Sequence, residues 1–211
     1  MPIITPTVVD LYHADRVTSF KTAATAGIVG VIHKATTGAT GKDAKYADRR
    51  KPALDAGLLW GAYHWGTAAD VASQVDNFLT AAKPDANTLV ALDFETTKGN
   101  QMTLDQARQF LTLIAQKLGR KAVIYSGNLL KESLGNQKDA FFGSHRLWLA
   151  QYGDTPVVQK SWSKFWLWQY TDGIAGPEKR TVDGIPGNEK GQLDCDFYAG
   201  TAAQLKAEWA S

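Results

Sequence analysis

The sequence of 211 residues contains a single cysteine, Cys195. One thiol excludes an intramolecular disulfide, and it also excludes the zinc sites that are built from several thiolates. The four histidines show neither an HExxH motif nor another paired spacing typical of metal ligands. The sequence therefore predicts chemistry that uses no metal ion.

The chain also lacks a long hydrophobic run. No stretch approaches the ~20 apolar residues that a membrane-spanning helix needs. Residues 1–13 do not combine a basic start with an apolar segment, as a secretory signal peptide does. We expect no membrane insertion and no signal peptide, so the product is expected to be made in the cytoplasm and then released to its site of action.

An excess of charge of one sign is absent as well. Lysine and arginine number 23 and aspartate and glutamate 21, which gives a formal net charge of +2. No basic cluster is dense enough for a nucleic-acid groove, whereas a slight positive charge favours approach to an anionic polymer. No repeat, linker or low-complexity segment divides the chain, so we expect one domain over residues 1–211 and a monomer.

Short apolar runs alternate with helical patterns along most of the chain. The early strands are expected at 7–11, 28–35, 58–65, 89–95 and 122–126. The helices are expected around 17–24, 44–56, 71–82 and 104–118, with a last one beginning at Thr201. Three late strands, with little helix between them, are expected at 146–152, 165–171 and 191–198.

This order of elements predicts an α/β fold. Five strand–helix units followed by three strands favour a closed, irregular barrel. The alternative is an open, doubly wound sheet. It is weaker because no glycine-rich phosphate loop follows any of the strands.

Two acids, Asp93 and Glu95, end the apolar run "LVALDFE" (89–95). In a strand, residues i and i+2 share a face, so their Cα atoms would lie ~6.5–7 Å apart. Barrel active sites lie at the carboxyl ends of the strands, and one of two close, partly dry carboxyl groups keeps its proton to higher pH. Glycoside cleavage uses such a pair. The alternative is that the strand simply ends in solvent, where acids are common.

Acids, amides and aromatic residues end several other predicted strands. Asp10 ends the first strand, Asp194 lies in the last, and Trp65 and Tyr152 end two others. Such a ring suits a sugar, because hydroxyl groups bond to amides and carboxylates while apolar sugar faces stack on rings. Each residue also has a structural reading, as a turn cap or as core. The expected substrate contacts are Tyr63, Tyr125, Trp148, Gln169 and Lys34.

The motifs also resemble a known family, the glycoside hydrolase family 25 lysozymes, which are Chalaropsis-type muramidases common among phage endolysins and bacterial autolysins. The resemblance covers nearly the whole chain and implies an irregular, flattened (β/α)5(β)3 TIM-like barrel. It rests on "VVDLYH" (8–13), "VIHKATTG" (31–38), "ALDAGLLWGAYHW" (53–65), "LVALDFE" (89–95), "AVIYSG" (122–127), "RLWLAQY" (146–152), "FWLWQYT" (165–171) and "VDGIPG…LDCDFYAGT" (182–201).

The resemblance implies roles for four acids. Glu95 matches the general acid of the family and Asp93 its second carboxylate, while Asp10 and Asp194 match the flanking acids. Asp194 is preferred over Asp196 because the family places its acid at the first polar position of the closing strand.

The activity implied is hydrolysis of the β-1,4 bond between N-acetylmuramic acid and N-acetylglucosamine in peptidoglycan, by a substrate-assisted route without a cofactor. The sequence departs from the family at Ala35-Thr36-Thr37-Gly38, where the family usually reads AxEG. Two alternatives stay open: a catalytically silent glycan-binding barrel and a chitinase-like glycosidase. A holin-dependent endolysin and a secreted effector fit the sequence equally well.

Overall fold

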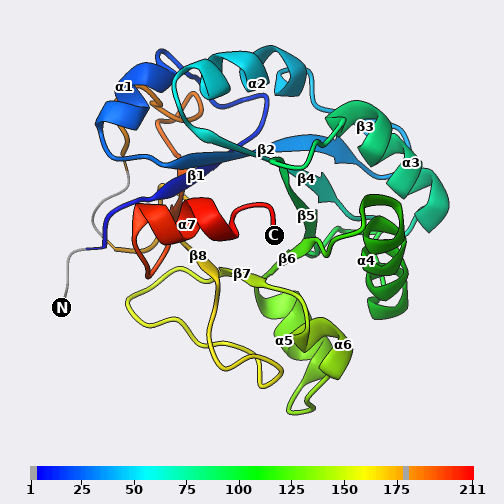
Figure 1. The fold of residues 1–211 in the computed structure, drawn as a ribbon. Coiled ribbons are helices and arrows are strands. Elements are labelled where there is room, and N and C mark those ends of the chain that lie inside the picture. The colour runs from blue at the N-terminus through cyan, green and yellow to red at the C-terminus, as the bar shows by residue number, and fades with distance from the viewer. Residues whose placement is uncertain (1–3, 178–180) are drawn as a thin grey trace.

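The strands of the computed structural model, which describes residues 4–177 and 181–211, form a closed barrel (Figure 1). Within these ranges, nine strands make one sheet in the order β1-β9-β8-β7-β6-β5-β4-β2-β3. An additional pairing of β1 with β2 closes the sheet, so the open-sheet alternative is wrong and the predicted barrel is confirmed. The strands are β1 (Val8–Leu11), β2 (Gly30–Thr37), β3 (Gly41–Lys42), β4 (Leu59–Trp65), β5 (Leu89–Asp93), β6 (Val123–Ser126), β7 (Leu147–Ala150), β8 (Leu167–Thr171) and β9 (Asp194–Phe197).

Helices surround the early strands of the barrel on the outside (Figure 1). They are α1 (Phe20–Thr25), α2 (Tyr46–Asp55), α3 (Val71–Ala82), α4 (Leu104–Leu118), α5 (Asn128–Leu134), α6 (Ala140–Gly143) and α7 (Ala202–Glu208). The sequence analysis does not locate α5, α6 or the short strand β3. As far as the structure describes the chain, none of these helices is both long and apolar enough to cross a membrane. Residues 1–3, the start of the segment searched for a signal peptide, lie outside the described residues.

The last three strands differ from the rest, as predicted. No helix forms in the fully described stretch 151–166, which connects the parallel strands β7 and β8. β9 runs antiparallel to both of its neighbours, β1 and β8. The missing helical layer on this side agrees with five strand–helix units followed by three strands.

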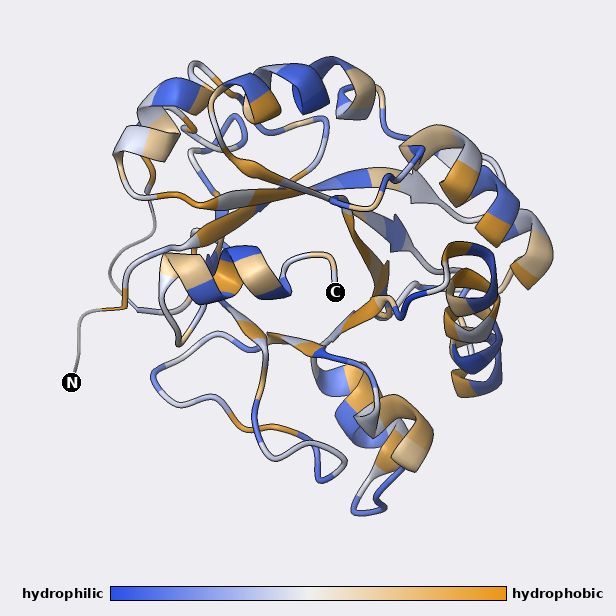
Figure 2. Ribbon diagram, viewed as in Figure 1, coloured by the Kyte–Doolittle hydropathy of each residue, from blue (hydrophilic) through white to orange (hydrophobic). Residues whose placement is uncertain are grey.

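The amphipathic helix α4 shows how the outer layer packs. Its capping box, in which Thr103 and Gln106 bond each other's backbone N–H groups, and the left-handed Gly119 at its end confirm the predicted boundaries. One face of the helix, including Phe110 and Ile114, is buried against the barrel. In Figure 2 the strands are coloured mainly as hydrophobic, whereas hydrophobic and hydrophilic residues alternate along each helix.

The strand β5 ends at Asp93, two residues earlier than predicted. Glu95 therefore lies beyond the strand, and strict strand alternation does not place it beside Asp93. Phe94 still donates its backbone N–H to the Tyr125 carbonyl at 2.9 Å, and its ring is buried in the outer core. This pairing holds the chain against β6 one residue past the strand, so that Glu95 stays close to the barrel end.

The opposite end of the barrel is closed by α7 and the residues after it (Figure 1). Trp209 is 2% exposed, and its Nε1 donates to the Trp60 carbonyl at 2.8 Å. A Cβ atom at Gly30 would lie 2.7 Å from the Trp209 ring, so the first residue of β2 has to be small. Arg120 and Arg146 donate to the carbonyl groups of Ala210 and Ser211 and hold the last turn in place.

The closure predicts a large effect of Trp209→Ala. Removing the buried indole leaves a cavity at the end of the barrel and should lower the free energy of unfolding by about 3–5 kcal/mol. Denaturant unfolding at pH 7 measures the change. The control is Lys206→Ala on the exposed side of α7, which should change the value by less than about 0.5 kcal/mol. Equal stabilities of the two variants would contradict the proposed closure.

Candidate active site

The carboxyl ends of the strands enclose a pocket of about 100 Å³. Eight of the nine site residues predicted from the sequence line it, and Trp65 and Tyr152 complete the wall. The lining residues are Asp10, Tyr63, Trp65, Asp93, Glu95, Tyr125, Trp148, Tyr152, Gln169 and Asp194.

Strand register brings the acids together. Asp10 on β1 lies opposite Asp194 on the antiparallel β9. Across the barrel, Asp93 on β5 lies between Trp65 on β4 and Tyr125 on β6. Side chains that are far apart in the sequence thus share one small volume because the sheet is closed.

Lys34 is the predicted site residue that does not line this pocket. A register shift between Lys34 and Thr36 interrupts β2, and the Lys34 ammonium group lies 4.4 Å from the centre of the Trp65 ring. Its positive charge lowers the pKa of both Asp93 and Glu95, although larger effects raise them. Lys34 therefore acts on the acids at least through its charge.

A hydrogen-bonded chain links the tyrosines to Asp10 through Gln169. The hydroxyl groups of Tyr125 and Tyr152 donate to Gln169 Oε1 at 2.8 and 3.1 Å. The amide Nε2 of Gln169 donates to Asp10 Oδ2 at 2.8 Å. These bonds fix the orientation of the amide, because one end only accepts and the other only donates.

Burial dominates the ionisation of the central pair. Asp93 is 3% exposed, and its burial and the charge of Glu95 raise its pKa well above the ordinary value. Its Oδ1 atom finds no hydrogen-bond donor among the described residues. Burial also raises the pKa of Glu95, against the opposing effects of the Tyr125 hydroxyl and the Lys34 charge. The pair can thus hold a proton at a pH where an exposed glutamate has lost it.

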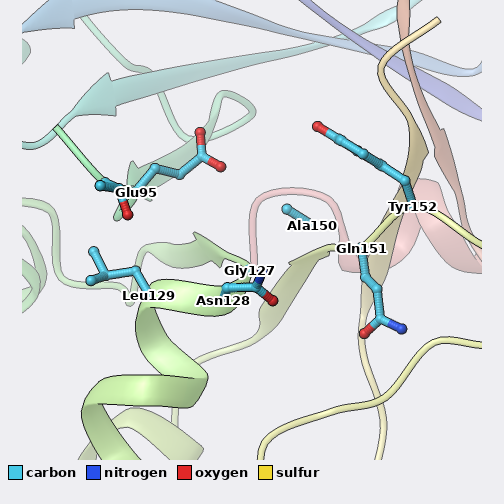
Figure 3. Close-up of a pocket in the computed structure, with 8 residues that line it drawn as sticks. Glu95, Gly127, Asn128, Leu129, Ala150, Gln151 and Tyr152 are labelled. Atoms are coloured by element: carbon cyan, nitrogen blue, oxygen red, sulfur yellow. The ribbon is translucent and has the colours of Figure 1, made fainter. Parts of the chain in front are cut away.

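A larger groove of about 680 Å³ adjoins the pocket. Glu95 and Tyr152 line both spaces, and in Figure 3 the Glu95 carboxyl group and the Tyr152 hydroxyl point toward one another across the groove. A ligand that fills the groove would contact Glu95, which forms part of its wall. The rest of the groove is lined by Thr96, Gly127, Asn128, Leu129, Ala150 and Gln151.

Three residues at the site are not among the expected catalytic residues or substrate contacts, although Trp65 and Tyr152 belong to the predicted ring around the acids. Trp65 lies two positions after Tyr63 on the same strand, so the two-residue period could have identified it as a further contact. Tyr152 follows the end of β7 in a loop, where the period no longer applies. Asp196 is fully buried and does not line the pocket. Its Oδ1 atom accepts a hydrogen bond from Nε1 of Trp148, which does line the pocket, at 2.6 Å.

The site offers no obvious cluster of metal ligands. Within 4–177 and 181–211, no group of three or more histidine, cysteine, aspartate and glutamate side chains is arranged to hold a metal ion. The polar groups of the pocket are instead carboxyl, amide and hydroxyl groups, and its apolar surface is aromatic. This composition suits a neutral ligand rich in hydroxyl groups.

Comparisons with known proteins agree with the geometry. The sequence model of Glycosyl hydrolases family 25 matches residues 9–178. Lysozyme M1 of Streptomyces globisporus is 24% identical over 214 residues, which cover 94% of this chain and 69% of that protein. The structure of a lysozyme from Streptomyces coelicolor superimposes with a TM-score of 0.82 at 24% identity, covering 96% of this chain and 95% of that one. The catalytic domain of an endolysin from bacteriophage P40 of Listeria monocytogenes gives a TM-score of 0.71 at 18% identity, covering 100% and 98% of the two chains.

The buried acid predicts that Asp93→Asn is more stable than the wild type at pH 7. Because the pKa of Asp93 is raised in the folded state, its contribution to stability falls as the pH rises from ~3.9, the unfolded value, through the folded value. Asparagine does not ionise, so the melting temperature at pH 7 should rise by ~2–4 °C for each kcal/mol recovered. The gain should disappear below about pH 4, where the unfolded chain is protonated too.

Thermal unfolding at pH 7 and at pH 3.5 measures both effects. The exposed Asp154 provides the matched control, since Asp154→Asn makes the same change of charge without removing a buried carboxyl group. A lower melting temperature of Asp93→Asn than of wild type at pH 7 would show that the Asp93 carboxylate is not strained in the fold.

Proposed function

The chain belongs to glycosyl hydrolases family 25 and is a glycoside hydrolase, and from this we propose that it is a muramidase. The bond cleaved is the β-1,4 linkage from N-acetylmuramic acid to N-acetylglucosamine in bacterial peptidoglycan. The observation that carries the proposal is the pair formed by the buried Asp93 and the partly buried Glu95. Both line the small pocket, and Glu95 also lines the larger groove beside it. A similar barrel is found in proteins named lysozyme and endolysin.

Glu95 is the general acid of the proposed reaction. Its position at the edge of the groove lets its carboxyl group reach the glycosidic oxygen of a glycan strand. Burial, which raises its pKa, keeps the proton available. As the bond between the anomeric carbon and this oxygen breaks, the proton moves from Glu95 to the leaving oxygen.

Asp93 assists the substrate as a stabilising carboxylate. The acetamido oxygen of the muramic acid attacks the anomeric carbon and forms a cyclic intermediate, while Asp93 accepts the acetamido N–H and stabilises the positive charge. Water then attacks the anomeric carbon, giving its proton to the Glu95 carboxylate and opening the ring of the intermediate. The Asp93 Oδ1 atom, which has no donor in the part of the chain that the structure describes, is free to accept this N–H.

The remaining lining residues bind and orient the sugar. Asp10 and Asp194 hold the polar network and tune the ionisation of the central pair, since a negative charge on either of them raises the pKa of Asp93. The aromatic rings offer apolar faces to the sugar, and the Gln169 amide and the hydroxyl groups bonded to it offer polar partners. The proposed contacts are Tyr63, Tyr125, Trp148, Gln169 and Lys34.

The biological setting follows from the substrate. We propose that residues 1–211 act as one catalytic domain and as a monomer on peptidoglycan strands. The protein would be made in the cytoplasm and released to the cell wall, either as a holin-dependent endolysin or as a secreted effector. The endolysin domain of similar fold supports the first route.

Glu95→Gln tests the proposal directly. The change keeps the shape of the side chain and removes the proton, so the rate of wall lysis should fall by about 10²–10⁴-fold without a loss of melting temperature. Loss of turbidity of purified cell walls gives the rate, and chitin oligosaccharides provide the comparison substrate. Near-normal lysis by the variant would remove Glu95 from the mechanism, and faster cleavage of chitin than of walls would favour a chitinase.

The role of Asp93 is tested with Asp93→Asn and with walls from which the N-acetyl groups have been removed. In a substrate-assisted reaction the asparagine still accepts the acetamido N–H, so a measurable residual rate is expected, whereas walls lacking the acetyl group should not be cleaved. Release of reducing sugar measures both rates. A covalent sugar adduct on Asp93, detected by mass spectrometry of the intact protein, would show a direct nucleophile instead.

A further inference from the structure

Asp196 is a buried acid that the proposed mechanism does not use. It lies two residues after Asp194 on β9, is 0% exposed, and faces the barrel interior like its neighbour. One oxygen, Oδ1, accepts the Trp148 Nε1–H at 2.6 Å. The other oxygen, Oδ2, has no hydrogen-bond donor among the described residues as long as the neighbouring carboxyl groups are ionised. A buried carboxylate oxygen without a donor is costly, so its surroundings have to be examined.

The neighbour of Asp196 is Asp10. In the antiparallel pair of β1 and β9, Val8 lies opposite Asp196 and Asp10 opposite Asp194. Asp10 and Asp196 are therefore diagonal neighbours on the same face of the sheet. Their side chains interact closely, since the charge of Asp196 raises the pKa of Asp10 and a hydrogen bond from Asp10 lowers that of Asp196. An ionised carboxylate has no hydrogen to donate, so such a bond requires a proton on Asp10.

The other charges near this pair make a second ionisation unfavourable. Besides Asp196, the charges that act most strongly on Asp10 are those of Asp15, in the loop after β1, and Glu95, after β5, and both are negative. Asp194 acts on Asp196 in the same sense. The charge of Asp10 or Asp196 also raises the pKa of six other titratable groups. They are Asp93, Tyr63, Tyr125, Tyr152, Tyr170 and Cys195.

We propose that Asp10 and Asp196 share one proton at neutral pH, carried by Asp10, and that Asp196 is thereby a positioning residue for the active site. The proton completes a continuous chain of bonds. Trp148 donates to Asp196 Oδ1, the Asp10 hydroxyl donates to Asp196 Oδ2, and Gln169 donates to the other side of Asp10. Every polar group in this chain then has a partner.

The shared proton also removes one negative charge from the wall of the pocket. With Asp10 neutral, Asp93 can ionise at a lower pH while Glu95 keeps its proton, which is the combination that the muramidase mechanism needs. This consequence rests on the proposed function, whereas the shared proton itself does not. The two can therefore be tested separately.

The first experiment measures the proton in the absence of substrate. Carboxyl carbon resonances of ¹³C-labelled aspartate, followed by NMR over pH 3–9, give the ionisation of each acid, and the spectra of Asp196→Asn and Asp10→Asn assign the two signals. In the wild type, Asp10 should still be protonated at pH 7. Asp10 and Asp196 both ionised at pH 7 would overturn the proposal, whatever the enzyme does to cell walls.

The second experiment measures the consequence for catalysis. In Asp196→Asn the amide oxygen still accepts from Trp148, and the amide N–H donates to Asp10, which then ionises. The negative charge moves toward the pocket, so the acid limb of the pH profile of kcat/KM should move upward by about one pH unit. The titration of Asp10 should move in the opposite direction, to lower pH.

The matched control is Cys195→Ala. Cys195 lies between the two acids on β9 and is buried in the outer core, so this change disturbs the same strand without touching the carboxyl pair. It should lower the melting temperature and leave the pH profile unchanged. An unshifted profile in Asp196→Asn, or the same shift in Cys195→Ala, would contradict the positioning role. If the wild type did not cleave cell walls while Asp10 was protonated at pH 7, the proposed muramidase function would be wrong. The proposal of a shared proton would still hold.

Discussion

The structure of the barrel depends on one constraint, which is that several carboxyl groups are held out of contact with water. Asp93 and Asp196 are almost completely buried, and a carboxylate taken out of water is unfavourable unless partners or protons compensate it. A closed barrel provides the enclosure. The pairing of β1 with β2 closes the wall and Trp209 fills the end opposite to the site. Asp93 therefore faces a small pocket and not bulk water, while Asp196 is buried beside that pocket.

The same constraint gives the site its chemistry. Burial raises the pKa of each acid, and the position of each partner decides how far. Lys34 and the Tyr125 hydroxyl oppose the rise at Glu95, which has access to the groove. Asp93 lacks a donor on one oxygen within the described chain, and so its carboxylate is ready to accept one from a ligand. A buried carboxylate without a full set of donors lowers the stability of the fold. The same carboxylate is suited to stabilising a positive charge that develops on a bound ligand.

The sequence predicts the barrel and most of the pocket because both depend on short-range periodicity. Apolar runs mark the strands, and the polar residues that end them mark one edge of the sheet. Glu95 shows a limit of this reasoning, since it lies past the end of β5 and reaches the pocket through the pairing of Phe94 with Tyr125. Glu95 lines the pocket, but the strand geometry expected for it is wrong.

Other features depend on contacts between distant segments and were not predicted. The capping residues predict a helix after Thr201, but only the folded barrel shows that Trp209 packs against Gly30. Asp196 has the same spacing as a wall residue, yet the diagonal contact with Asp10 depends on the register of β9. The helices α5 and α6 are only seven and four residues long, too short for a helical period to stand out.

The central claim is that burial keeps a proton on Glu95 at a pH where an exposed glutamate is ionised. A ¹³C NMR titration of the Glu95 carboxyl carbon in the free protein, assigned by its loss in Glu95→Gln, measures this most directly. The account predicts a pKa above the ordinary value of 4.5, and a further rise when the Lys34 charge is removed in Lys34→Met. A Glu95 carboxyl group that titrates at or below the ordinary value would contradict it.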